Sequence, residues 1–164
     1  MGTPVGGGPQ PRGRAGPAVP PGKPFELRGP SFRLGVPAGW SDRSVYCVTT
    51  PGAGELQATF AVTRSDCPRG VTLADCAQDQ LRQLAGQLAE FQVVRSEKRL
   101  LGTRECHRAQ FTWKTADGLV VRQSQWYLQQ GDSVYALTAT APVDSFAQFE
   151  PQFDQLVAAF TPVG

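Results

Sequence analysis

The sequence predicts an α+β fold, in which an antiparallel β-sheet of six to seven strands carries two packed helices in the order βββ-α-ββββ-α. Seven short runs are rich in β-branched and aromatic residues and are separated by Gly, Pro or Asp-Gly turns. Two other segments space their apolar residues by three or four, which is typical of amphipathic helices. Because short turns join the strands, we expect hairpins in one sheet with the helices packed against it.

The N-terminal segment differs from the rest of the chain. Gly and Pro occupy more than half of residues 1–24, and almost no apolar side chains are available for burial. Such a composition cannot offset the entropy of ordering the backbone, so we expect a disordered leader over 1–24 and a folded domain over 25–164. Three strands are expected first in this domain: Ser31–Val36, Ser44–Thr50 and Glu55–Arg64.

A first helix is predicted over Thr72–Glu90. Thr72 and Asp75 have the spacing of a capping box. Apolar residues then step by three or four: Leu73, Ala77, Leu81, Leu84, Leu88 and Phe91. In the strand before this helix Phe60 and Val62 share a face, and we expect that face to pack on the helix.

Four further strands and a second helix are predicted after the first helix. The strands are Phe91–Leu100, Glu105–Thr115, Leu119–Gln129 and Ser133–Ala141. An apolar, mostly aromatic stripe marks the second helix: Phe146, Phe149, Phe153, Leu156, Val157 and Phe160. Asp144 or Ser145 is the expected cap. Since proline is favoured in the first turn of a helix, Pro151 predicts a regular start near Gln148.

Length and charge exclude several classes of function. A chain of 164 residues suits one globular domain. Its formal net charge of +2 is too small to indicate electrostatic binding of nucleic acid. No apolar run approaches the roughly 18 residues of a membrane span, so we expect no direct membrane insertion. The N-terminus also lacks the apolar stretch of a secretory signal, which predicts a cytoplasmic protein.

The four cysteines, Cys47, Cys67, Cys76 and Cys106, form no C-x-x-C pair and have no partnered histidines. Their spacing does not match a zinc site, and neither a metal nor another cofactor is expected. The cytoplasm would keep them as thiols, whereas in an exported protein Cys67 and Cys76 would be the nearest candidate pair. Catalysis is not expected either, because the single histidine, His107, has no placed nucleophile and carboxylate.

One stretch, VRQSQWYLQQGDSVYAL at 121–137, alternates in an unusual way for a half-buried strand. Val121, Gln123, Gln125 and Tyr127 share a face that lacks the charges which normally solvate the outer side of a sheet. Similar sets of small or weakly polar residues alternate in three other strands: Val45, Cys47 and Thr49; Thr59, Ala61 and Thr63; Val134, Ala136, Thr138 and Thr140. Cross-strand glutamine pairing is the ordinary explanation for the glutamines. Because uncharged faces recur in four strands, we favour a groove lined by these side chains.

The first helix repeats the pattern beside its leucine stripe, where Cys76, Gln80, Gln83 and Gln87 lie at helical spacing. Glutamines are good helix formers on a wet surface, and that explanation stays open for Gln83 and Gln87. Gln80, next to the apolar stripe, is the better candidate for a half-buried polar group. A groove of small side chains and amides could receive a helix rich in Gly, Ala and Leu, as membrane helices receive one another.

Five stretches of the sequence, in order, carry a resemblance to a known family: FRLGVPAGW, QATFAVTRSD, ADCAQDQLRQLAGQL, VRQSQWY and FEPQF. From about Phe25 to Pro162 the chain resembles the DcrB family, whose fold is similar to that of the photosystem protein PsbP. Within that family it is most similar to the effector-associated (Eag) chaperones of bacterial type VI secretion.

The resemblance implies a cytoplasmic homodimer that binds the hydrophobic N-terminal helices of a secreted effector and shields them from water before export. By alignment with the family, the helix-binding positions would be Val45, Cys47, Ala61, Gln80 and Gln123, and the two glutamines would hydrogen-bond the captured helices. Cys47 stands where the family carries an aliphatic residue, although a thiol packs as a small hydrophobe. The alternative is a generic DcrB-like structural or envelope-associated module without an effector client.

Overall fold

The computed structural model of the chain describes residues 23–28, 33–38, 44–50 and 58–162 and divides into two compact units, Met1–Asp42 and Arg43–Gly164. The first unit holds strand β1 (Phe25–Arg28) paired antiparallel with β2 (Arg33–Val36). Strand β2 lies inside the expected strand 31–36. Strand β1 was not predicted, because its four residues FELR are too few to show an alternation. The expected leader falls almost wholly on residues 1–22, which lie outside the described residues.

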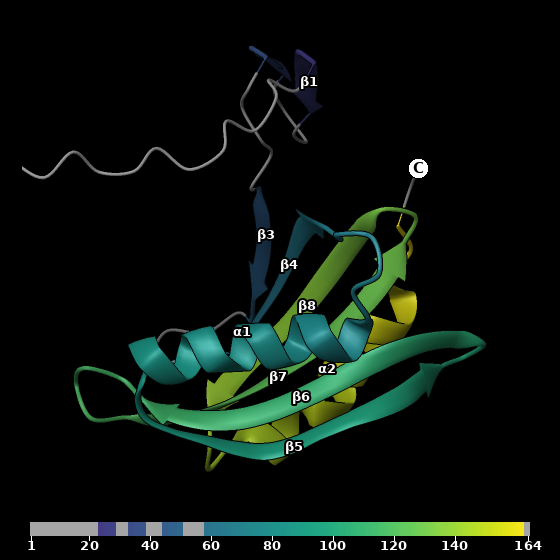
Figure 1. Cartoon of the computed structure of the whole chain (residues 1–164). Helices are drawn as coiled ribbons and strands as arrows, with labels where there is room; N and C mark the ends of the chain where they lie inside the picture. Colours follow the sequence, from purple (N-terminus) through teal and green to yellow (C-terminus); the bar gives the residue numbers. More distant parts are fainter. Residues whose placement is uncertain (1–22, 29–32, 39–43, 51–57, 163–164) are drawn as a thin grey trace, which may run out of the picture. The chain divides into compact units, whose positions relative to one another are not determined.

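The second unit is built on a six-stranded sheet of order β3-β4-β8-β7-β6-β5, in which every neighbouring pair is antiparallel. Its strands are β3 (Val45–Thr49), β4 (Thr59–Asp66), β5 (Ala89–Leu101), β6 (Arg104–Lys114), β7 (Val120–Gln130) and β8 (Ser133–Pro142). Helices α1 (Leu73–Gln87) and α2 (Phe146–Ala159) complete the unit (Figure 1). The predicted α+β class and its antiparallel sheet with two helices are thereby confirmed.

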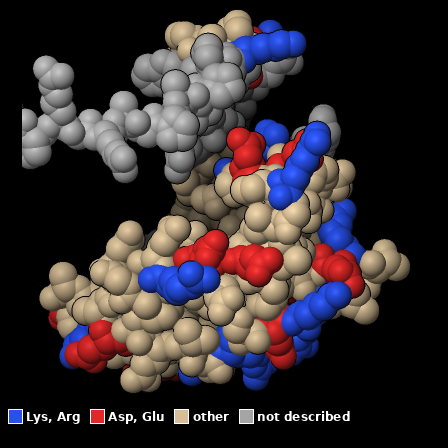
Figure 2. All heavy atoms as spheres, viewed as in Figure 1, with Lys and Arg blue, Asp and Glu red and all other residues tan. Residues whose placement is uncertain are grey.

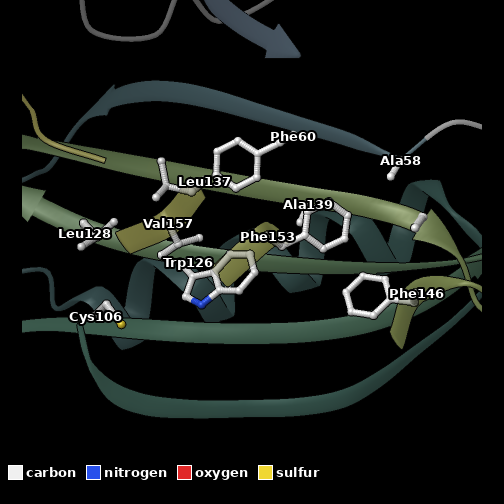
Figure 3. Packing of buried hydrophobic residues seen from close by; sticks show 11 residues of the cluster. Ala58, Phe60, Cys106, Trp126, Leu128, Leu137, Ala139, Phe146, Phe153 and Val157 are labelled. Carbon is white, nitrogen blue, oxygen red and sulfur yellow. The ribbon is translucent and has the colours of Figure 1, made fainter. Parts of the chain in front are cut away.

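Helix α2 packs on one face of the sheet. Its buried residues Phe146, Phe153 and Val157 form a single cluster with residues of β4, β6, β7 and β8 and with Ala58, which directly precedes β4 (Figure 3). The sheet members of this cluster are Phe60, Cys106, Trp126, Leu128, Leu137, Ala139 and Ala141. The expectation that Phe60 and Val62 face the first helix was wrong, since both belong to the α2 side. Alternation shows which residues share a face, but it does not show which helix covers that face.

Helix α1 packs on the opposite face and covers only part of it. Its buried residues Ala77 and Leu81 form a second cluster with the sheet residues Ala109, Phe111, Tyr127 and Val134 and with Cys67. The helix contacts strands β5, β6 and β7 (Figure 1). Strand β8 contributes Val134 and Ala136 to this cluster, whereas β3 and β4 lie beyond β8 in the sheet, so their part of the face is left beside α1 rather than beneath it.

The start of α1 is a complete capping box, as its spacing predicted. The Asp75 backbone N–H donates to the Thr72 hydroxyl at 3.1 Å, and the Thr72 backbone N–H donates to the Asp75 carboxylate at 3.0 Å. The helix ends at Gln87 rather than at the predicted Glu90. Glu90 has a φ of 51°, in the left-handed region, and the chain has already entered β5 at Ala89.

Helix α2 begins earlier than predicted. Ser145 is its N-cap, but the regular helix starts at Phe146 rather than near Gln148, and Pro151 lies inside it. Phe146 is 1% exposed, and its ring centre lies 5.5 Å from that of Phe153. Burial of this aromatic pair requires the extra turn, and it outweighs the hydrogen bond that the proline cannot donate.

Candidate functional site

Three rows of side chains cross the sheet on the face that carries α1. In an antiparallel sheet, directly paired residues project to the same side. The register therefore places each of the following sets in one row, running from β3 through β4 and β8 to β7: Val45, Thr63, Ala136 and Tyr127; Cys47, Ala61, Thr138 and Gln125; Thr49, Thr59, Thr140 and Gln123. Since Tyr127 and Ala136 belong to the α1 cluster, this face is the α1 side.

These rows carry no charged residue. We call these rows, without the buried Tyr127 and Gln125, the uncharged strip, which comprises Val45, Cys47, Thr49, Thr59, Ala61, Thr63, Ala136, Thr138, Thr140 and Gln123. In Figure 2 charged side chains stand out along α1. The usual solvated side of a sheet would carry Lys or Glu at several such positions.

Exposure increases along each row from β7 to β3. Tyr127 and Gln125 are buried under α1, at 4% and 7% exposure. Residues of β8 and β4 are half-buried, and Val45 on β3 is 60% exposed. The strip is therefore continuous with the protein core at one end and open to solvent at the other.

One flank of α1 borders the strip. Cys76 packs against the apolar cluster that contains Cys67, and Cys67 directly follows β4, so this flank of the helix lies toward the end of β4. Gln80 lies one turn further along the same flank, because residues four apart share a helix face. Its side chain is half-buried. Gln83 and Gln87 are exposed, which agrees with their interpretation as surface helix formers.

The buried glutamine of β7 is satisfied by the protein itself. Gln125 donates from Nε2 to the Thr138 hydroxyl at 3.4 Å and accepts a hydrogen bond from the Tyr127 hydroxyl. Burial raises the pKa of Tyr127 far above its usual value, so the phenol stays protonated and continues to donate. For Gln125 the unusual alternation thus has an internal explanation, namely a closed polar network beneath α1.

Gln123 and Gln80 differ from Gln125 in this respect. Both are half-buried, and within the described part of the chain neither side-chain amide makes a hydrogen bond. A primary amide has two donor hydrogens and an acceptor oxygen. The strip and its helical flank therefore present hydrogen-bonding groups that are partly removed from water and have no partner among the described residues.

Four of the five residues expected at the site lie on one face of the sheet, and the fifth lies on α1. Val45, Cys47, Ala61 and Gln123 share the strip, and Gln80 stands on the flank of α1. The expected set omitted Thr138 and Thr140, which lie in the rows between β4 and the glutamines of β7. Their alternation with Leu137 and Ala139 in the sequence was the signal that could have added them.

The described residues offer few other groups that could act in catalysis or bind a metal. His107 lies on β6, where its Nε2 is 2.9 Å from the Ser96 hydroxyl, and burial lowers its pKa. Within residues 23–28, 33–38, 44–50 and 58–162, no group of three His, Cys, Asp or Glu side chains is placed to hold a metal ion. In the same ranges, no helix is both long and apolar enough to cross a bilayer.

A six-stranded antiparallel sheet with one helix on each face defines this unit as a PsbP-like α+β protein. The chain belongs to the DcrB family, whose profile matches residues 33–159. No curated relative matches the sequence.

Solved structures with this fold share little sequence with the chain. PA94 from Pseudomonas aeruginosa, a protein of unknown function, has a TM-score of 0.70 at 20% identity, with 86% of this chain and 98% of that chain covered. The cyanobacterial PsbP protein CyanoP from Synechocystis has a TM-score of 0.50 at 13% identity, covering 91% and 96%. LpqN from Mycobacterium tuberculosis, which is involved in cell envelope biogenesis, has a TM-score of 0.50 at 14% identity, covering 74% and 87%. At such identities the likeness concerns the fold.

Proposed function

We propose that this protein is a cytoplasmic, non-catalytic chaperone that binds the hydrophobic N-terminal helices of a type VI secretion effector before export. The observation that supports the proposal is the uncharged strip beside α1. It combines small side chains with the half-buried amide of Gln123, and Gln80 on α1 adds a second half-buried amide; neither amide has a partner among the described residues.

The dimensions of the strip suit an α-helix. Neighbouring strands lie about 4.8 Å apart, so the three strands β3, β4 and β8 span roughly 10 Å from first to last. An α-helix with its side chains is about 10–12 Å across. A helix lying along the strip would therefore contact all three strands, with α1 along one side.

The side chains of the strip suit a membrane helix in particular. Small residues such as Ala61 and Ala136 allow close approach, and Thr138 and Thr140 add hydroxyls. Transmembrane helices associate through small residues and interhelical hydrogen bonds. Gln123 and Gln80 would then bond polar atoms of the bound helix, which would otherwise be left unsatisfied when water is excluded.

A homodimer is part of the proposal. Val45 is 60% exposed at the open end of the strip, so one copy covers a bound helix from the sheet side and from α1 only. A second copy related by two-fold symmetry would enclose the helix from the remaining side. Light scattering is then expected to give twice the chain mass of 17.6 kDa.

A second candidate function is a structural or envelope-associated module without an effector client. The observation that favours it is the likeness in fold to LpqN, which is involved in cell envelope biogenesis. The two candidates differ in their ligand, since only the chaperone must bind an apolar helix.

Co-purification decides between the two. A soluble carrier protein bearing an N-terminal helix of about 20 Leu, Ala and Gly residues would be co-expressed with this protein. The chaperone function predicts a stable complex and a soluble carrier. A control carrier, whose helix has the same length but a Lys at every fourth position, should not be retained. Equal recovery of both carriers, or of neither, would contradict the proposed function.

A further inference from the structure

Two cysteines flank the turn between β4 and α1, and both pack into the same apolar cluster. Cys67 directly follows β4, and its backbone N–H donates to the Asp132 carbonyl at 2.7 Å, which fixes the end of the strand to the β7–β8 turn. The chain then reverses, because the Val71 N–H donates back to the Pro68 carbonyl at 3.2 Å. This turn returns the chain to the sheet, and Cys76 lies in the first turns of α1.

The two side chains pack into one apolar cluster. The Cys76 backbone N–H donates to the Thr72 carbonyl at 3.0 Å, one residue beyond the Val71 carbonyl that the Cys67 thiol approaches. Cys67 is 8% exposed, and its sulfur lies 3.7 Å from the carbonyl oxygens of Pro68 and Val71. Cys76 is only partly covered, so a small reagent can reach it. Burial, and then the adjoining Cys67, raise the pKa of the Cys76 thiol, so this thiol stays largely protonated at neutral pH and exchanges slowly with a disulfide.

We propose that Cys67 and Cys76 form a modification site, at which a small-molecule disulfide such as oxidised glutathione converts the two thiols into one intramolecular disulfide. This bond would fasten the start of α1 to the end of β4. The inference does not depend on the proposed helix binding.

The exchange balances without any further reactant. The Cys76 thiolate attacks one sulfur of the reagent, which forms a mixed disulfide and releases one thiol. The Cys67 thiolate then attacks the Cys76 sulfur, which forms the protein disulfide and releases the second thiol. The protein loses two protons and two electrons, and the reagent's disulfide bond is reduced to two thiols.

The remaining cysteines cannot replace either partner. Cys47 is exposed on β3, in the strip on the α1 side, and Cys106 is 2% exposed within the α2 cluster on the other face of the sheet. The sheet separates Cys106 from Cys76. Selectivity for the pair Cys67 and Cys76 therefore follows from their placement.

The test uses the full chain with Cys47→Ser, which removes the exposed thiol and leaves three. After treatment with oxidised glutathione under native conditions, we expect one free thiol and a mass lower by two hydrogens. Proteolysis should release one linked peptide pair, containing Cys67 and Cys76. The disulfide closes a loop of nine positions, so the Tm should rise by roughly 5–10 °C and return after reduction.

The matched control is Cys47→Ser with Cys76→Ser, which alters a partly exposed residue and leaves the buried Cys67 in place. It should keep both of its thiols and its Tm after the same treatment. A persistent glutathione adduct on Cys76, three unreacted thiols in the test protein, or a linked pair whose Tm is unchanged or lowered would each overturn the proposal.

Discussion

The guanidinium of Arg108 donates a hydrogen bond to the Glu150 carboxylate at 2.8 Å and thereby joins β6 to α2. The two ends of this pair differ in exposure: the Arg108 side chain is 10% exposed, whereas that of Glu150 is 39% exposed. The guanidinium also lies 5.1 Å from the centre of the Trp126 ring. If the pair is broken, Glu150 can regain water, but Arg108 remains largely buried with an unpaired charge.

Removal of Glu150 should therefore cost more stability than replacement of Arg108 by an apolar residue. We expect Glu150→Ala to lower the free energy of unfolding by about 1–3 kcal/mol, because it leaves the buried guanidinium without its partner. Arg108→Met keeps an apolar chain against Trp126 and should cost less. Urea denaturation of both variants checks the order, and a larger loss for Arg108→Met would contradict this account of the pair.

The capping box of α1 makes stability depend on pH at the acidic end. Hydrogen bonds from the side chain and then the backbone of Thr72 hold the pKa of Asp75 below its ordinary value of 3.8. A carboxyl with a lowered folded pKa stabilises the fold above the unfolded value, and this contribution disappears as the pH falls through the folded pKa. Asp75→Ala should therefore be less stable than the wild type at pH 7, and the difference should shrink below pH 3.8.

Denaturant titrations at neutral and acidic pH measure this difference. The matched control is Asp79→Ala, which removes the same charge from an exposed position on α1 that pairs with Arg82 on the surface. Its stability should stay close to that of the wild type at both pH values. A difference for Asp75→Ala that persists unchanged at low pH would rule out the carboxylate as its cause.

Most of the fold could be predicted from local patterns. Alternation located the strands from β3 to β8, and the capping residues Thr72 and Asp75 located the start of α1. The errors share a cause, because local sequence patterns do not show how the helices and strands are arranged in space. The start of α2 was predicted near Gln148 because proline is favoured in the first turn of a helix and Pro151 would then lie there. In the structure the helix begins at Phe146, because that residue is buried. Phe60 was assigned to the wrong helix for the same reason.

The candidate site was predictable in part. Alternation alone placed Cys47, Ala61 and Gln123 on comparable faces of their strands, and the strand register was needed to show that those faces are the same one. The different roles of Gln123 and Gln125 could not be predicted. They depend on the position of α1, which buries the polar network of Gln125 and leaves Gln123 at the border.

The unpaired amide of Gln123 predicts a loss of affinity when it is removed. Gln123→Ala should leave the fold intact, because the side chain is half-buried and makes no hydrogen bond within the described residues. In the complex, its loss would leave a polar atom of the bound helix unsatisfied, at about 1–3 kcal/mol. That corresponds to roughly a five- to 150-fold weaker Kd for the carrier-borne apolar helix, measured by fluorescence anisotropy.

Gln130→Ala is the control for this measurement. Gln130 lies on the same strand but is exposed and projects to the opposite face of the sheet. Its variant should bind as the wild type does. Gln80→Ala should behave like Gln123→Ala, since Gln80 borders the same strip from α1. If both of these variants bind with unchanged affinity, the amides do not contact the helix.

Binding of an apolar helix to the uncharged strip is tested most directly by Ala61→Arg. Ala61 is half-buried at the middle of the strip, between Cys47 on β3 and Thr138 on β8. An arginine there would occupy the path of the helix and would have to lose water on binding. The matched control is Ala85→Arg, the same substitution at an exposed position on α1. The account predicts that Ala85→Arg retains the apolar carrier and that Ala61→Arg, folded by circular dichroism, does not. Retention of the carrier by folded Ala61→Arg at wild-type affinity would contradict it.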